Sequence, residues 1–220
     1  MKKNFFIRLA LISFLSLLGM HLYSQDSQFL RQNSGRNHSG FYLSLAPGAN
    51  FTNVKMEDND GSTTSKGLGA GWDIKIGGTL KENLILHATI LMHSVYEPKI
   101  YDSSNGLNGA TADKIDLFEA MVGAGMTYYT YGNFLLSTSI GLGGFTITDE
   151  KKDEDSSSDK GFSFQLKAGK EWWVSPRWGI GLALYYHNTN LLNQKGTVDE
   201  ERIKSNNFGL VLNATLNGKR

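Results

Sequence analysis

The strongest constraint on the fold is an alternation of apolar and polar residues that recurs in eight separate segments of the chain. Within each segment nearly every second side chain is apolar, and the intervening positions are mostly polar residues or glycine. Successive side chains of a β-strand point to opposite faces of a sheet, so this period of two predicts strands with one apolar and one polar face. The predicted strands span residues 40–48, 67–80, 84–97, 115–130, 134–147, 162–174, 178–187 and 207–217.

The connections between these segments alternate in length. Three are short, at residues 81–83, 131–133 and 175–177, and four are long and polar, at residues 51–66, 98–114, 148–160 and 188–205. Short and long connections on opposite sides are typical of an up-and-down antiparallel barrel of the outer-membrane type. An even strand number also lets the last strand close on the first, which removes the unpaired edges of the sheet.

The two faces of the predicted strands differ in chemistry, and this leaves two architectures open. The apolar face carries Trp72, Phe118 and most of the leucines, while the other face carries charged residues and much of the glycine. A transmembrane barrel would turn the apolar face outward, and a soluble lipocalin-like barrel binding an apolar ligand would turn it inward. An eight-stranded interior is only just wide enough for ordinary side chains. The sequence therefore favours an all-β fold, an eight-stranded antiparallel up-and-down transmembrane β-barrel.

The beginning of the chain has the pattern of an export signal. Lys2, Lys3 and Arg8 make a basic start, and a largely apolar stretch runs from residue 5 to residue 18. Gly19 ends this stretch, and Ser24 offers a small residue for cleavage. A basic start, an apolar stretch too short to span a bilayer and a small residue predict a cleaved secretory signal peptide. We expect a signal peptide at residues 1–24, a short polar periplasmic lead-in at 25–39 and the barrel at 40–220.

Composition excludes several classes of function. The formal net charge of +1 argues against a general nucleic-acid-binding surface. The chain has no cysteine, which rules out disulfide scaffolds, thiolate metal sites and cysteine nucleophiles. No motif in the sequence indicates a cofactor.

The eight alternating segments, the four long connections and the export signal together resemble the small outer-membrane β-barrels of Gram-negative bacteria. The pattern is similar to the OmpA/OmpX-type "outer membrane protein beta-barrel domain" group, a porin-like family, and the junction of Ser24 and Gln25 resembles cleavage sites of Bacteroidetes. This resemblance implies location in the cell outer membrane. It also implies contact with outer-membrane lipid and lipopolysaccharide, and with the outer-membrane assembly machinery.

Five charged residues fall on the face that would point inward in a transmembrane barrel. They are Asp73, Lys75, Glu119, Lys167 and Glu171. A charge inside a narrow barrel must be paired or hydrated. Two bases and three acids roughly balance, which favours a polar network that fills the lumen over a conduit.

The histidines do not predict a metal site. His87 and His93 share the inward face of one predicted strand, but six residues separate them, or ~20 Å along a strand. We therefore expect no bound metal.

The run from His187 to Asn190 suggests an enzymatic alternative. It is similar to a His-x-Ser-Asn run of outer-membrane lipid A deacylases, with Thr189 in the serine position and Glu200 or Glu201 available as the orienting acid. A hydroxyl, an imidazole base and a carboxylate can form a catalytic triad. The predicted register turns His187 inward, away from lipid acyl chains, so these residues are candidates that we do not adopt.

Aromatic residues gather near the ends of the predicted strands, and Tyr96, Tyr128, Trp172 and Trp178 are candidates for the membrane interfaces. The acidic run at 149–155 and residues 58–61 lie in long connections. Clustered oxygens can bind Ca²⁺, but neither stretch has the spacing of a known calcium loop.

The sequence therefore predicts a non-enzymatic outer-membrane barrel with a structural or surface-interaction role. Its four long loops would contact an unknown extracellular ligand. A narrow conduit for small solutes, a lipid A deacylase-like hydrolase and the soluble lipocalin-like barrel remain alternatives.

Overall fold

A computed structural model gives the fold of the chain. It describes residues 37–58, 61–102, 106–112, 114–149, 154–194 and 201–218. The predicted signal peptide and all but the last residues of the predicted lead-in lie outside this part of the chain. The eight long strands are β1 (Phe41–Glu57), β2 (Ser62–Lys81), β3 (Leu84–Tyr96), β6 (Ile115–Tyr129), β7 (Phe134–Asp149), β9 (Gly161–Trp173), β10 (Trp178–Asn193) and β11 (Glu201–Asn217).

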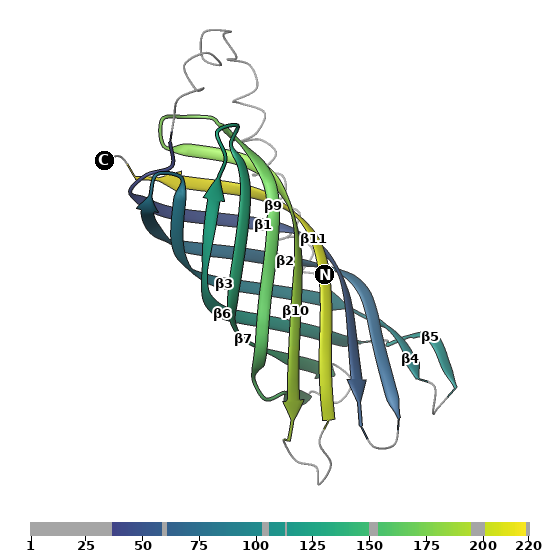
Figure 1. Ribbon diagram of the computed structural model, residues 1–220. Coiled ribbons are helices and arrows are strands. Elements are labelled where there is room, and N and C mark those ends of the chain that lie inside the picture. The colour runs from purple at the N-terminus through teal and green to yellow at the C-terminus, as the bar shows by residue number, and fades with distance from the viewer. Residues whose placement is uncertain are drawn as a thin grey trace. The chain divides into compact units, whose positions relative to one another are not determined.

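The long strands form a closed antiparallel barrel, as the alternation predicts. Each pairs with its sequence neighbours among the long strands, and β1 pairs with both β2 and β11. Figure 1 shows these strands wrapping around a common axis, with the short connections at one end. We call the end with the turns after β2, β6 and β9 the short-turn end, and the other the long-loop end. Closure gives every long strand a hydrogen-bonded neighbour on each side.

The apolar face points outward on all eight long strands. Leu86, Val122, Ile140, Leu184 and Leu210 each expose more than half of their surface on the outer wall, and Leu184 exposes 65%. The alternate positions are largely buried inside. The lipocalin-like alternative, which requires the apolar face inward, is therefore wrong.

The height of the apolar wall fits a membrane. Phe41 and Phe51 both point outward from β1, at the two ends of the apolar stretch. Ten residues cover ~33 Å of strand, which a tilt of ~40° reduces to ~25 Å along the barrel axis. This matches the apolar band of outer-membrane barrels.

Asparagine occupies the strained position of two short turns. Asn83, between β2 and β3, has φ 63°, and Asn133, between β6 and β7, has φ 58°. Among residues other than glycine, asparagine adopts this left-handed conformation with little penalty. The turns can therefore be tight enough to join neighbouring strands.

The strands run farther toward the long-loop end than the sequence predicts. The predicted connections at 51–66 and 188–205 are mostly strand, because β1 continues to Glu57 and β10 to Asn193. The prediction was wrong here because the outward residues become polar where the strands leave the apolar wall. Every second side chain nevertheless still points into the barrel there, as the buried Val54 on β1 and Leu191 on β10 show.

The other two long connections also contain strands. Within 98–114, β4 (Lys99–Asp102) pairs with both β2 and β5 (Leu107–Thr111), and within 148–160, β8 (Glu154–Ser157) pairs with β7. Figure 1 shows the β4–β5 hairpin projecting beyond the barrel wall. Among the described residues, no helix is long and apolar enough to cross a membrane.

Candidate functional site

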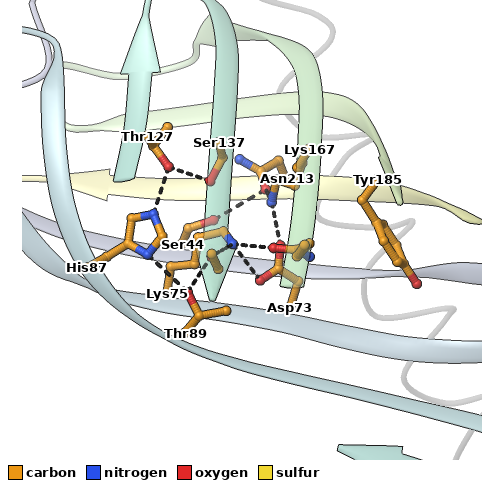
Figure 2. A network of polar contacts seen from close by, with 12 residues as sticks. Ser44, Asp73, Lys75, His87, Thr89, Thr127, Ser137, Lys167, Tyr185 and Asn213 are labelled. Carbon is orange, nitrogen blue, oxygen red and sulfur yellow. Dashed lines mark hydrogen bonds and ion pairs between the residues drawn. The ribbon is translucent and has the colours of Figure 1, made fainter. Parts of the chain in front are cut away.

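The centre of the barrel holds an ion network contributed by opposite walls. Asp73 and Lys75 come from β2, and Lys167 comes from β9, which is not a neighbour of β2. Lys167 Nζ donates to Asp73 Oδ2 at 2.8 Å, and Lys75 Nζ lies 3.1 Å from Asp73 Oδ1. All three side chains are buried. One carboxylate thus balances two cations, and Figure 2 shows it between them.

Neutral groups complete the coordination of these lysines. Lys75 Nζ donates to Gln165 Oε1 at 2.7 Å, and Lys167 Nζ donates to Asn213 Oδ1 at 2.7 Å. A buried ammonium needs several acceptors to offset its lost hydration. The network therefore spans β2, β9 and β11 through direct side-chain contacts.

Glu171 lies closer to the short-turn end and is held by neutral donors. Its Oε1 accepts from Tyr129 Oη at 2.7 Å and from Asn213 Nδ2 at 2.5 Å, and its Oε2 accepts from Thr215 Oγ1 at 2.7 Å. Gly181 provides space, because a Cβ there would come within 2.7 Å of the Glu171 side chain. The sequence places Glu171 inside but gives no sign of these partners.

Glu119 forms a second acidic centre toward the long-loop end. Its Oε2 accepts from Ser205 Oγ and from Asn207 Nδ2, both at 2.8 Å, and its Oε1 lies 3.5 Å from His187 Nδ1. The donors come from β11 and the histidine from β10, whereas Glu119 is on β6. These contacts again cross the barrel.

His93 and His187 meet across the lumen, whereas His87 is separate from them. His93 Nε2 lies 3.3 Å from His187 Nδ1, and Tyr185 Oη lies 3.1 Å from His93 Nδ1. His87 instead contacts the hydroxyls of Thr89 and Thr127 at 3.0 and 2.9 Å. In the part of the chain that the structure describes, no group of three or more histidine or acidic side chains could hold a metal ion.

Two of the deacylase candidates, His187 and Thr189, lie inside the barrel. Thr189 Oγ1 is 3.4 Å from His187 Nε2, but both side chains are fully buried, and Thr189 also contacts Ser163 Oγ at 2.5 Å. Glu200 lies outside the described residues. Glu201 accepts a hydrogen bond from Asn193, so the carboxylate beside His187 is Glu119. This hydroxyl, imidazole and carboxylate do not face the outer wall, where acyl chains would lie.

A layer of buried apolar side chains lies in the interior toward the long-loop end. It consists of six inward side chains from six strands: Val54, Val95, Leu117, Phe145, Leu191 and Ile203. None exposes more than 4% of its surface. We call it the apolar plug. Sequence analysis missed it because three of its members fall in stretches assigned to loops, although the alternation through Asn50, Thr52 and Val54 could have shown it.

His38 occupies the short-turn end. Its ring stacks on Tyr129 with centroids 3.4 Å apart, and its Nδ1 donates to Asn217 Oδ1 at 3.0 Å. The His38 backbone N–H also donates to Asn83 Oδ1 at 2.9 Å. Burial lowers the pKa of His38 to about 4, so the ring is neutral at pH 7. The end of the predicted polar lead-in is therefore packed into the barrel mouth.

The four aromatic candidates for the membrane interfaces all point outward. Tyr128, Trp172 and Trp178 lie near the short-turn end, and Tyr96 lies near the long-loop end, each exposing 41–60% of its surface. The acidic run at 149–155 and the 58–61 connection fall partly outside the described residues. Within them, Asp155 Oδ1 accepts from Thr148 Oγ1 at 2.6 Å and Asp58 Oδ1 accepts from the Gly61 backbone at 2.8 Å.

The sequence matches the profile of the family "Outer membrane protein beta-barrel domain" over residues 12–215. The chain belongs to this family. Membership places it in the outer membrane, in agreement with the apolar outer wall. No curated protein sequence matches the chain.

Solved structures similar to this chain include two outer-membrane proteins. Neisserial surface protein A is 15% identical with a TM-score of 0.52, over 83% of this chain and 100% of that chain. The outer membrane protein OprG from Pseudomonas aeruginosa is 8% identical with a TM-score of 0.47, over 82% of this chain and 98% of that chain. The likeness to Neisserial surface protein A shows a shared barrel fold and nothing of function.

Proposed function

We propose that this protein is a non-enzymatic outer-membrane barrel whose lumen is closed to solutes and which acts through its extracellular face. The apolar plug carries the proposal. Six buried apolar side chains, from six of the eight long strands, lie together in the interior toward the long-loop end, and such a layer opposes the passage of polar solutes. The ion network and the Glu119 centre fill the space behind it.

Among the described residues, the interior charges are not arranged as expected of a conduit. A conduit needs charged groups that line a water-filled path and can exchange partners with a passing solute. Here the lumen-facing charges instead contact one another or fixed neutral groups from opposite walls. Breaking such buried contacts costs several kcal/mol, so the network favours a permanent filling over a gate.

The long-loop end offers the surface for an interaction. The β4–β5 hairpin extends the sheet of β2 past the end of β3, and residues such as Leu107 are exposed on it. Outer-membrane barrels place long loops outside the cell and short turns in the periplasm. We infer that the long-loop end is extracellular and that residues 1–24 are a cleaved signal peptide.

Planar-bilayer recording tests the closure. We expect wild-type protein, with its insertion verified by faster migration on a gel when unboiled, to give no discrete conductance steps in concentrated KCl. Discrete steps that change in size or ion selectivity in Glu119→Gln or Lys167→Gln would contradict the proposal and establish a conduit.

Protease treatment of intact cells tests the orientation. We expect cleavage within the β4–β5 hairpin while the barrel stays protected. Cleavage that requires an opened outer membrane would place the long-loop end in the periplasm and overturn the orientation.

A further inference from the structure

One side of the outer wall carries a dense group of cations just beyond the apolar surface. The group comprises Lys55 on β1, Lys66 on β2, Lys99 on β4, and Arg202 and Lys204 on β11. We call these five residues the basic strip. Their strands are adjacent in the sheet, in the order β4, β2, β1, β11.

The register sets like charges directly against each other. Lys55 is the cross-strand partner of Lys204, and Lys66 is the partner of Lys99. Partners in an antiparallel pair share a face of the sheet, so each pair projects outward together. Like charges placed directly opposite one another destabilise a sheet unless something neutralises them.

The chain supplies little neutralisation of its own. Among the described outward-facing residues of these strands beyond the apolar wall, Glu57 is the one acid, and its Oε1 lies 2.5 Å from Lys55 Nζ. Lys66 Nζ lies over the ring of Tyr101, 5.1 Å from its centroid, which does not reduce its charge. Five cations and one carboxylate therefore share the strip.

The strip lies at the depth of lipid headgroups. The apolar wall ends at Phe51 and Phe208, which are opposite each other on β1 and β11. Lys55 follows Phe51 by four residues, or ~13 Å of strand and ~10 Å along the membrane normal at a tilt of ~40°. Its side chain points sideways from the barrel wall, toward the headgroups of surrounding lipid.

On the opposite side of the barrel, the outward-facing residues at the same level beyond the apolar wall include acidic and neutral side chains. There the outward residues include Asp116 on β6, Thr146 and Thr148 on β7, and Asp155 on β8. Lys114 and Lys160 are also exposed toward this end of the barrel, but acidic residues accompany them. Among the described residues, the excess of positive charge is therefore greatest along the basic strip.

We propose that the basic strip is a binding site for the phosphate groups of a phosphorylated glycolipid in the outer leaflet. Lysine and arginine bind phosphate through charge-assisted hydrogen bonds, and basic clusters beside an apolar anchor recognise anionic lipid headgroups. The acyl chains would lie against the adjoining apolar wall around Phe51 and Phe208. This lateral position distinguishes a lipid from a soluble polyanion, which would approach from above.

Binding to lipid A in uncharged detergent micelles tests the proposal. The strip variant Lys55→Gln/Lys66→Gln/Lys204→Gln is compared with the control variant Lys81→Gln/Lys114→Gln/Lys160→Gln, which removes equal charge from exposed sites elsewhere. We expect wild type and control to bind bisphosphorylated lipid A equally and the strip variant to bind about a hundredfold more weakly. Monophosphorylated lipid A should bind wild type more weakly than the bisphosphorylated form.

Three results would overturn the site. The strip variant could bind as tightly as wild type, the control could lose as much affinity, or soluble heparin could bind while lipid A does not. The stability of the folded protein against unfolding, measured with and without lipid A, tests both that the variant folds and that it binds the lipid. In lipid-free micelles Lys204→Gln should resist unfolding at least as well as wild type, because the substitution removes one like-charge pair. It should gain less stability than wild type when bisphosphorylated lipid A is added.

Discussion

His93 Nε2 and His187 Nδ1 lie 3.3 Å apart although their strands, β3 and β10, are not neighbours in the barrel. Side chains from opposite walls are therefore in direct contact at this level of the lumen. At the centre of the barrel, the contact between Asp73 on β2 and Lys167 on β9 also joins opposite walls.

Replacing the central carboxylate should be the most damaging change in the ion network. Asp73→Asn leaves Lys75 and Lys167 buried without their counterion, and we expect a loss of about 3–5 kcal/mol in the free energy of unfolding. Urea titration of the protein in lipid vesicles measures this loss. The exposed Asp155→Asn should change stability by less than ~0.5 kcal/mol. A greater loss from Lys75→Met than from Asp73→Asn would show that Asp73 does not hold the network together.

Gly209 should not tolerate a side chain. A Cβ at this position would lie 2.2 Å from the ring of Tyr185, which is held in place by His93. We expect Gly209→Ala to cost about 1–3 kcal/mol by overpacking. In a double-mutant cycle, Tyr185→Leu should remove most of this penalty. Equal penalties in both backgrounds would mean that the ring is not the obstacle.

The contacts of His38 at the short-turn end should weaken in acid. Its pKa is lowered to about 4, against 6.5 for an unburied histidine. The undocked state therefore takes up its proton first, so the stability of docking falls as the pH falls from about 6.5 to about 4. The ring-carbon NMR signal of His38, assigned by its loss in His38→Gln, should titrate below pH 5. Titration near 6.5 would show that the ring is exposed to water.

Expression of the protein should leave lipid A acylation unchanged. His187 and Thr189 are buried inside the barrel and contact Glu119 and Ser163 there, with no exposure to acyl chains. Mass spectrometry of lipid A from expressing cells measures this directly. Loss of an acyl chain with wild type but not with Thr189→Ala would establish the deacylase alternative.

The fold could be predicted because a single regularity determines it. A period of two assigns each side chain of a strand to the inner or the outer face of the sheet. Asp73, Lys167 and Glu171 could therefore be placed inside without knowledge of their partners. The turns follow from the lengths of the connections. The prediction of strand ends was less successful, because past the apolar wall both faces of β1 and β10 become partly polar.

The partners inside the lumen could not be predicted. Contacts such as Glu119 with Ser205 depend on how far each strand is staggered when the barrel closes. The sequence does not show that stagger for strands that are not neighbours. The apolar plug was missed because Val54, Leu191 and Ile203 fall in stretches that the sequence analysis assigned to loops.

Accessibility of a single cysteine tests most directly whether the lumen is closed. The chain has no cysteine, so Ser139→Cys introduces one thiol in the middle of the interior, beside Thr89. The exposed Ser157→Cys on β8 is the matched control. With protein folded in lipid vesicles, we expect a small water-soluble methanethiosulfonate to label residue 157 at once and residue 139 only after unfolding. Labelling of both positions at the same rate would show a water-filled lumen and contradict the proposed closure.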